Sequence, residues 1–364
     1  MLFNRINIHH FRGIESLAME NIKRINVLTG RNHCGKTSVL EAIFLLVGMS
    51  NPQLAVGIHN FRGLKLTDAK DFSYLFHGFD FSRHPSLTGG LESEKRTLEI
   101  KPIHPIFTGQ QEPAENRPIS STWMTTEDAL DGLAFDFTVD ENAFHAEVKI
   151  TQVHPTTLPG ADIGRINVTS VSDYKENLHA SFINPGTIMN GLYQRLEAVL
   201  VRKESEGIIH ALREIEPNLR DVRLGTGGKI YADITHMGRL VPINIMGDGI
   251  IKILAILVAI LEMKEGILLI DEIENGLHYS ALMPLWKAIF KMALESNVQL
   301  FVATHSDECI DAMVRTYRDY HESGIGEDSI RLFRIDRNKE GQHRAFGYDS
   351  DLLLAGIEED FEVR

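Results

Sequence analysis

The segment Gly30–Thr37 reads Gly-Arg-Asn-His-Cys-Gly-Lys-Thr, and its pattern guides the interpretation of the whole chain. It follows an apolar stretch of strand character, Arg24–Thr29, and opens an apolar stretch of helix character, Ser38–Leu46. This is the context of a phosphate-binding loop, in which glycines let backbone N–H groups surround phosphates at a helix N-terminus. We expect Lys36 to reach the β- and γ-phosphates and Thr37 to offer its hydroxyl to Mg²⁺. The segment therefore predicts binding of a nucleoside triphosphate. The residues expected to contact it are Gly30, Asn32, Gly35, Lys36, Thr37 and Ser38.

Two carboxylates follow a run of four aliphatic residues further along the chain. Ile267–Ile270 reads Ile-Leu-Leu-Ile, the pattern of a strand buried on both faces, and Asp271 and Glu272 come directly after it. Ligands of open α/β sheets bind at the carboxyl ends of strands, so both side chains are expected at the phosphate site. We expect Asp271 to hold Mg²⁺, directly or through water, and Glu272 to position or deprotonate the attacking water.

A histidine follows a second apolar strand, Val298–Ala303. At this strand end the neutral imidazole of His305 could donate one hydrogen bond to the γ-phosphate. A histidine in such a place can also be structural, but the preceding acidic motif favours the phosphate role. Cys309, on the helix that follows, is interpreted as a core residue.

A third motif, Gly247-Asp248-Gly249, stands before the apolar helix predicted for Ile250–Met263. Glycines at a helix N-terminus expose backbone N–H groups and offer a second place to hold a phosphate, although a simple helix cap explains them equally well. One chain cannot easily direct two helix ends at one γ-phosphate, whereas a second copy can. The motif therefore favours a dimer with nucleotide between its subunits.

The two ends of the chain carry the nucleotide motifs, and the middle carries fewer signals. The C-terminal third alternates apolar strands with helices, which predicts a parallel sheet covered on both faces. Alternating residues predict a hairpin with strands Leu133–Val139 and Phe144–Ile150, and helical periodicity covers Asn190–Arg213. Residues 51–111 are expected to be rich in loops. The predicted division is an N-terminal ATPase part at 1–100, an inserted β and helical lobe at 101–240 and a C-terminal ATPase part at 241–364.

Composition excludes several classes of protein. A net charge of −13 excludes attraction of the whole surface to nucleic acid or anionic membrane, so any DNA contact needs a local basic patch. The longest apolar stretch, Ile253–Leu261, is far below the roughly 20 residues that cross a bilayer. The first residues lack the apolar core of a signal peptide. Two cysteines do not make a disulfide framework, and a cytoplasmic protein is expected. Cys34 lies beside a helix N-terminus, where a thiolate is favoured.

Together these motifs resemble those of the ABC-type ATPases of the SMC, RecF and OLD (overcoming lysogenisation defect) group. The resemblance covers the first 50 residues and Ile243–Ala312, and the run Asp271–Ser280 is closest to OLD-like bacterial ATPases. It implies an α/β fold with a mixed or parallel central sheet covered by helices, plus an inserted β-hairpin and helical lobe. It also implies ATP and Mg²⁺ as cofactors and a homodimer, or a higher oligomer, that sandwiches ATP. The matching motifs are Gly30–Thr37 with Walker A, Ile267–Glu272 with Walker B, Gly247–Gly249 with the signature, Asn275–His278 with the D-loop, His305 with the switch histidine and Phe11–Gly13 with the N-terminal turn.

The chain departs from this group at three points. The signature has Gly247 where the group has serine, and neither Gln53 nor Gln110 makes a convincing Q-loop. No Toprim nuclease domain is expected after the last ATPase helix, and the acidic residues near the C-terminus are interpreted as a solvated tail. The resemblance therefore suggests an ATPase subunit that controls a separate effector, of Toprim type or another nuclease, in anti-phage defence or DNA processing.

Two other functions stay open. One is a RecF-like repair ATPase that binds DNA directly, which the acidic charge disfavours. The other is a nucleotide-binding scaffold with little turnover, which the altered signature keeps possible.

Overall fold

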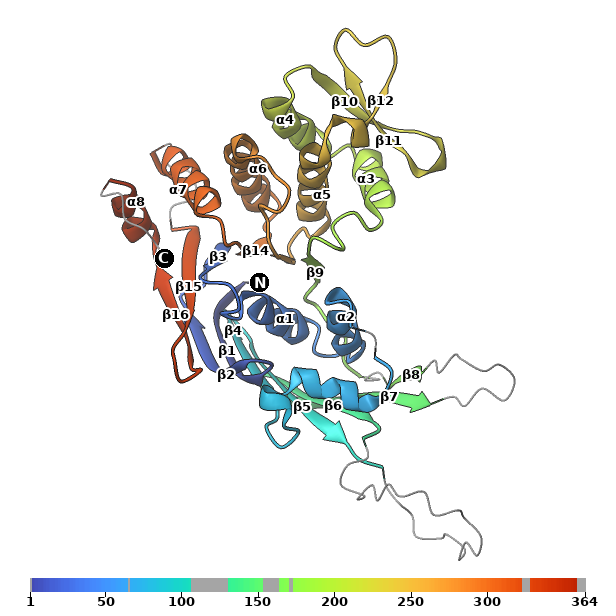
Figure 1. Ribbon diagram of the computed structural model, residues 1–364, viewed down its shortest axis with the longest axis vertical. Helices are drawn as coiled ribbons and strands as arrows, with labels where there is room; N and C mark the ends of the chain where they lie inside the picture. The colour runs from blue at the N-terminus through green and yellow to red at the C-terminus, as the bar shows by residue number, and fades with distance from the viewer. Residues whose placement is uncertain are drawn as a thin grey trace, which may run out of the picture.

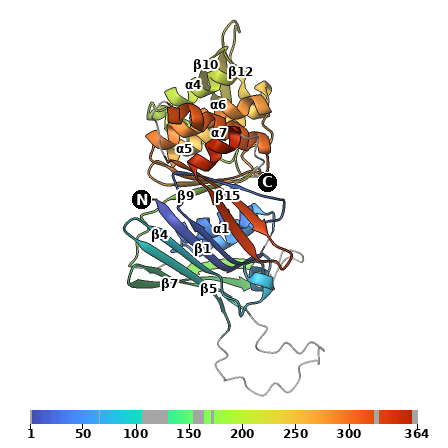
Figure 2. The same cartoon turned by 90° about the vertical axis from the view of Figure 1, so that its left-hand side faces the viewer.

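The computed structural model describes residues 2–64, 66–105, 130–152, 164–169, 173–322 and 328–358. Within them, two large β-sheets lie on either side of helix α1 (Lys36–Val47), and further helices cover the outer face of one sheet (Figure 1). Figure 2 shows the same order of layers from the side. Two apolar cores result, one between the sheets around α1 and one beneath the outer helices. Gln110, one of the two glutamines considered for a Q-loop, lies outside the described residues, as do the acidic residues Glu359 and Asp360 near the C-terminus.

The sheet that carries the nucleotide motifs has six strands in the order β16-β15-β3-β14-β13-β9. All neighbouring strands run parallel except β15 and β16. The predicted α/β fold with a mixed, mainly parallel sheet is therefore confirmed. Register places Ile270 beside Val302 and Val302 beside Val27, so the carboxyl ends of three motif-bearing strands lie at one edge. The strands are β3 (Ile25–Thr29), β9 (Ala180–Ile183), β13 (Ile267–Ile270), β14 (Gln299–Ala303), β15 (Ile330–Arg337) and β16 (His343–Tyr348).

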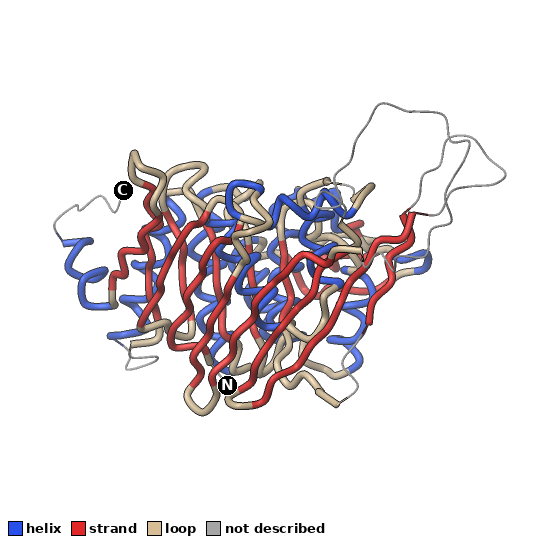
Figure 3. Tube along the Cα trace, turned by 90° about the horizontal axis from the view of Figure 1, so that it is seen from below, coloured by secondary structure: helices blue, strands red, loops and turns tan. Residues whose placement is uncertain are grey.

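The other large sheet is antiparallel, with seven strands in the order β2-β1-β4-β5-β6-β7-β8 (Figure 3). Its apolar side chains alternate with polar ones, as in β2, and the apolar face packs on α1. The predicted hairpin is present as β6 and β7, and it extends the sheet begun by the N-terminal strands. The strands are β1 (Phe3–Phe11), β2 (Ile14–Glu20), β4 (Ser86–Leu91), β5 (Lys95–Ile103), β6 (Gly132–Val139), β7 (Asn142–Gln152) and β8 (Gly164–Thr169).

The outer helical layer is built around α5 (Asp248–Glu262), which is apolar on almost every side because α3, α4 and α6 surround it. A small sheet, β10-β11-β12, lies beyond α3 and α4 (Figure 1). No helix in the described part of the chain has both the length and the apolar character to cross a membrane. The other helices are α2 (Gln53–Phe61), α3 (Leu192–Val201), α4 (Glu206–Ile215), α6 (Leu282–Glu295), α7 (Asp307–Glu322) and α8 (Ser350–Glu358), and the small strands are β10 (Leu219–Leu224), β11 (Ile230–Ile234) and β12 (Val241–Pro242).

The structure corrects three sequence-based expectations. The single helix predicted for Asn190–Arg213 is two helices, because the chain turns between them at Lys203, which has a φ of 61°. The region predicted to be rich in loops contains α2, β4 and β5. The polar C-terminal region contains β15, β16 and α8, and Asp349 accepts a backbone hydrogen bond from Leu352 at the start of α8. Short polar-faced strands carry weak periodicity, and neighbouring strands decide their conformation.

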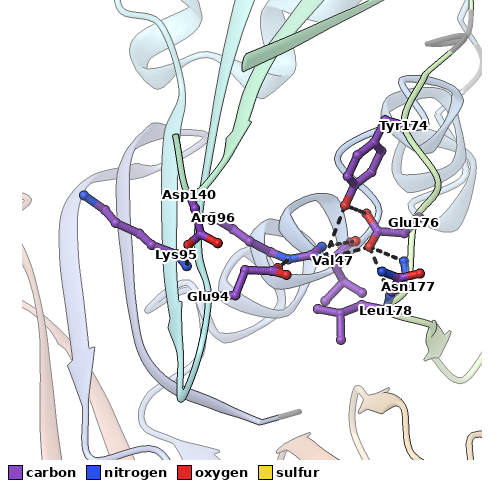
Figure 4. A network of polar contacts seen from close by, with 9 residues as sticks. All are labelled: Val47, Glu94, Lys95, Arg96, Asp140, Tyr174, Glu176, Asn177 and Leu178. Carbon is purple, nitrogen blue, oxygen red and sulfur yellow. Dashed lines mark hydrogen bonds and ion pairs between the residues drawn. The ribbon is translucent and has the colours of Figure 1, made fainter. Parts of the chain in front are cut away.

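A buried arginine, Arg96 on β5, ties the layers together (Figure 4). Its guanidinium donates to the carbonyl of Val47, at the end of α1, at 3.2 Å and to Glu176 Oε1 at 2.8 Å. It also pairs with Glu94, and Tyr174 lies beside it. Burial raises the pKa of Tyr174 to about 12. Because Glu176 lies in the segment that leads into β9, Arg96 holds that segment against the end of α1.

Candidate nucleotide-binding site

The loop Gly30–Thr37 has the backbone that a phosphate-binding loop requires. Gly30 has a φ of 130°, and a Cβ there would collide with the carbonyl oxygen of Ile335 on β15. Gly35 has a φ of 98° and forms the N-cap of α1, packed against His343 and Ile14. Both conformations are rare for residues with a side chain, so glycine is required at both positions. The loop therefore turns tightly and directs the free N–H groups at the start of α1 outward.

Lys36 lies across this loop. Its ammonium donates to the carbonyl of Gly30 at 2.7 Å and to that of Arg31 at 3.2 Å. The positive charge is thus held at the mouth of the loop, next to the start of α1. An anion bound by the loop would meet the ammonium, the helix N-terminus and the exposed N–H groups together.

The predicted metal-binding pair is brought together by the sheet. Thr37 Oγ1 donates to Asp271 Oδ2 at 2.9 Å, although the two residues are 234 positions apart in sequence. Burial raises the pKa of Asp271, the hydrogen bond from Thr37 opposes this, and the neighbouring charge of Glu272 adds to it. The pair fits Mg²⁺, which takes one or two protein oxygens and completes its shell with phosphate and water. The described residues contain no group of three acidic, histidine or cysteine side chains that would form a closed metal cage.

We predict that Asp271→Asn stabilises the nucleotide-free protein and abolishes Mg²⁺-dependent turnover. A raised pKa means that the ionised carboxylate is less favourable in the folded than in the unfolded chain, so its charge destabilises the fold at neutral pH. Removing it should therefore raise the melting temperature at neutral pH. The gain should vanish as the pH falls through the raised pKa, which thermal melts over an acidic pH series would show. An unchanged or lower melting temperature at neutral pH would contradict this account.

Glu272 lies exposed beside Asp271 and has a φ of 50°, a strained conformation for a residue other than glycine. Its Oε2 accepts a hydrogen bond from Asn275 Nδ2 at 3.2 Å. A small cavity is lined in part by Asp271, Glu272, Asn275 and Asn184. The carboxylate is therefore accessible to water at the edge where the motif-bearing strands end.

His305, the predicted phosphate contact, is half exposed just beyond the end of β14. Its Nδ1 lies 2.9 Å from Glu274 Oε1, and the same oxygen accepts the backbone N–H of His305. Sequence reasoning did not single out Glu274. The sequence signal that could have identified Glu274 as a site residue is its position, three residues after Asp271 in the turn that follows β13.

Asn184 lies beside Asp271, and sequence reasoning did not single it out. It follows β9, whose last residue, Ile183, pairs with Ile270. The side chain is buried, and its Oδ1 accepts hydrogen bonds from the N–H groups of Gly186 and Thr187, both at 2.9 Å. In contrast, Gln53 is exposed at the start of α2. The sequence offered only a weak signal for Asn184. It is a polar residue after a four-residue apolar strand, and so short a strand has little periodicity.

Two arginines share one buried carboxylate next to the phosphate loop. Glu41, on α1, pairs with Arg12 and with Arg62, in both cases at 2.7 Å. Burial lowers the pKa of Arg12 to about 10. Arg62 also reaches the hydroxyl of Ser38 at 3.4 Å. Glu41 is thus shared by two guanidiniums beside the first turn of α1, and Asp271 adds a second negative charge that acts on Arg62.

The segment Gly247-Asp248-Gly249 does not complete this site within one chain. No hydrogen bond or ion pair among the described residues joins it to Gly30–Thr37. Gly247 and Asp248 are exposed at the start of α5, and Gly247 has a φ of 98°. One turn later, Lys252 donates to the carbonyl of Asn275 at 2.9 Å, which fixes α5 against the turn after β13.

Cys34 departs from expectation. Its side chain is buried within the loop, and burial raises the pKa of the thiol, which favours the neutral form over the thiolate. Desolvation outweighs the nearby charge of Lys36 here. Cys309 is fully buried, as predicted.

This combination of a phosphate loop, an acidic strand end and two stacked sheets defines the class of ABC-type P-loop ATPases related to SMC and RecF. The family model "AAA domain, putative AbiEii toxin, Type IV TA system" matches residues 25–311, and the chain belongs to this family. The protein is therefore an ATPase.

Similar proteins agree with this class. A Helicobacter pylori protein named "ATP/GTP phosphatase" is 23% identical over 338 residues, 87% of this chain and 89% of that protein. The DNA replication and repair protein RecF of Idiomarina loihiensis is 46% identical over 46 residues, 13% of each chain. The crystal structure of an SMC head bound to the C-winged helix domain of ScpA has a TM-score of 0.52 at 11% identity, covering 96% of this chain and 99% of that one. The last comparison concerns the fold alone.

Proposed function

We propose that this protein is an ATP-hydrolysing switch that dimerises around its nucleotide and controls a separate effector. The observation that supports this most is the contact of Thr37 with Asp271 in one chain, while Asp248 stays exposed and apart from them. The first two residues supply half of a site for a metal-bound triphosphate. The exposed glycine segment supplies a phosphate-binding helix end that only another subunit can use.

Within one chain, each motif has a distinct role in this proposal. The N–H groups of the loop and the ammonium of Lys36 bind the phosphates, and Lys36 exchanges its loop carbonyls for phosphate oxygens. Thr37 and Asp271 hold Mg²⁺, which supplies charge neutralisation on the phosphates when bound. Glu272 positions or deprotonates the attacking water from its exposed place, and His305 contacts the γ-phosphate. The contact set of the loop is completed by Gly30, Asn32, Gly35 and Ser38.

The surroundings of the loop add two further groups. The guanidinium of Arg62 lies beside Ser38 and can offer hydrogen-bond donors to an anion at the start of α1. Asn184 lies next to Asp271 at the edge of the shared cavity. We propose that it senses the metal and γ-phosphate from the end of β9. Because Arg96 holds the segment before β9 against α1, movement of Asn184 would be coupled to the loop helix.

The composite site is tested by complementation. Asp248→Arg should block closure of the dimer while leaving ATP binding by the isolated loop nearly intact, because Asp248 makes no contact with that loop. Lys36→Ala should also be inactive, because it keeps the Asp248 segment but lacks the ammonium that binds the phosphates. Mixing Asp248→Arg with an excess of Lys36→Ala should restore some phosphate release, since one site of each mixed dimer then has an intact loop and an intact signature segment.

Two outcomes would refute the composite site. Asp248→Arg could be fully active alone, or turnover per subunit could be independent of concentration in a sample shown by ultracentrifugation to be monomeric. Phosphate release close to zero from the wild-type protein at every concentration would instead favour the scaffold function.

The effector role rests on wider similarity. The family description refers to a putative toxin of a toxin–antitoxin system, which supports a place in anti-phage defence or DNA processing, and an OLD-like subgroup fits the motif run after Asp271. The solved SMC head carries a winged-helix domain of another protein, so this fold accommodates a protein partner. We propose a separate nuclease, of Toprim type or another kind, as that partner, and a cytoplasmic location. The division of the chain at residues 100 and 240 stays a prediction.

The alternative is a RecF-like function, and a DNA-binding assay distinguishes it from the proposed switch. The RecF match covers only 46 residues, and the net charge of −13 gives no general attraction to DNA. Duplex binding that strengthens with ATP and weakens steeply with salt would favour it.

A further inference from the structure

Glu274 is a buried carboxylate with one oxygen in use and one without a partner. Its side chain is 10% exposed, in the turn between β13 and α6. Oε1 accepts the backbone N–H of His305 and lies 2.9 Å from His305 Nδ1. Oε2 is fully buried and makes no hydrogen bond to any described residue. The backbone N–H of Ile273 donates to the carbonyl of Ala303 at 3.3 Å, which holds this turn against the end of β14.

The geometry determines which nitrogen of His305 carries hydrogen. A backbone N–H can only donate, so the Glu274 oxygen that receives it acts as an acceptor. The Glu274 carboxylate can only accept hydrogen bonds. Nδ1 must therefore be the donor to Oε1, and the neutral ring has its lone pair on Nε2.

This assignment changes what His305 can do. Nε2 is on the side of the ring away from Glu274, and the ring is half exposed, so this nitrogen remains for a ligand. A neutral ring in this tautomer cannot donate to a phosphate oxygen through Nε2, contrary to the expectation from sequence. It can do so only after it gains a proton.

We propose that Glu274 is a positioning residue, which fixes His305 with hydrogen on Nδ1 so that His305 contacts the γ-phosphate as an imidazolium, protonated at Nε2. The tautomer follows from the geometry alone, whereas the phosphate contact rests on the proposed function. The proton comes from solvent when nucleotide binds, and the cation then lies between the Glu274 carboxylate and the phosphate. The Nε2–H bond forms as hydronium or a buffer acid in the solvent gives up the proton, and no other covalent bond changes.

The surroundings favour a cation at this position. The charged side chains closest in sequence to this contact are acidic: Asp271, Glu272 and Glu274 follow β13, and Asp307 and Glu308 stand in the first turn of α7, whereas the arginines of α7 come later, at Arg315 and Arg318. Glu274 lies within hydrogen-bond distance of the ring, 2.9 Å from Nδ1. The N-terminus of α7 opposes a cation, and the two acidic residues in its first turn offset this effect. A buried carboxylate oxygen without a partner is costly, and a positive charge next to the carboxylate reduces that cost.

The tautomer is tested first, on the full chain without nucleotide, by ¹⁵N NMR of histidine-labelled protein. The His305 signals are identified as those missing from His305→Asn. We expect the wild type and Glu274→Gln to show the Nδ1–H pattern, because the glutamine oxygen still accepts from both groups. Glu274→Ala should shift toward the Nε2–H pattern that free imidazole prefers. A wild-type His305 in the Nε2–H form would overturn the proposal, and matching thermal melts would show that each variant is folded.

Proton uptake is tested next, by calorimetry of a non-hydrolysable ATP analogue in buffers of different ionisation enthalpy. The wild type should take up more protons than His305→Asn, Glu274→Ala or Glu274→Gln, while Glu197→Gln, exposed on α3, should match the wild type. Turnover should fall about 10-fold or more in Glu274→Ala with little change in KM, less than the roughly 100-fold loss of a group that itself transfers a proton, because Glu274 acts through His305. Equal uptake by the wild type and His305→Asn would refute the imidazolium while leaving nucleotide binding intact. Failure of the wild type to bind the analogue would instead refute the proposed function. The tautomer assigned by NMR would not be affected, because that experiment uses no nucleotide.

Discussion

Lys36→Ala should lower ATP turnover by at least ~100-fold, the loss typical when one preorganised charge is removed from a phosphate-transfer site. The ammonium is held over the loop by the carbonyls of Gly30 and Arg31, so it meets the phosphates without a large rearrangement. Without it, the phosphate charge has only N–H groups and the helix end to compensate it. The fold should survive, because the loop shape depends on its glycines and on packing against Ile335. Phosphate release and binding of labelled ATP measure the two effects.

The matched control is Lys291→Ala, which removes an exposed lysine from α6, away from the site. This variant should keep wild-type turnover and melting temperature. If Lys36→Ala retained turnover within about twofold of this control, an effect of only ~0.4 kcal/mol, the phosphate role of Lys36 would be wrong.

Glu272→Gln should preserve ATP binding and reduce hydrolysis by ~100-fold or more, as expected for loss of a general base. Glutamine keeps the size and hydrogen-bonding oxygen of the side chain, so the contact with Asn275 can persist. The residue is exposed, and the substitution creates no cavity. Because hydrolysis opens the composite site in the proposed switch, the variant should accumulate as an ATP-bound dimer. Gel filtration with ATP and single-turnover phosphate release would measure both effects.

Glu197→Gln, which makes the same chemical change on the exposed surface of α3, serves as its control. Phosphate release from Glu272→Gln at the control rate would refute the catalytic assignment. A Glu272→Gln protein that binds ATP, fails to hydrolyse it and stays monomeric would leave the catalytic role intact and contradict the dimeric switch.

The local sequence was sufficient to predict the elements that depend on residues close together in the chain. The strand, glycine loop and helix around Lys36 predicted a phosphate loop, and the aliphatic run before Asp271 predicted a buried parallel strand. Both elements are present, because short-range backbone preferences and complete burial act on contiguous residues. The class of ATPase followed from these motifs. The same kind of reasoning was wrong between Asn190 and Arg213, where one periodic pattern is two helices joined by a turn at Lys203.

Contacts between distant segments had no signature in the sequence and were decided by the tertiary structure. Parallel register placed Asn184 beside Asp271, and the turn after β13 placed Glu274 against His305. Burial raised the pKa of the Cys34 thiol, although the helix N-terminus alone favoured the thiolate. Periodicity reports whether a side chain faces the core or the solvent, but it does not report which other segment it meets there. The contacts between segments depend on strand order and register, which place the Glu274 carboxylate against His305 and the Asn184 side chain beside Asp271.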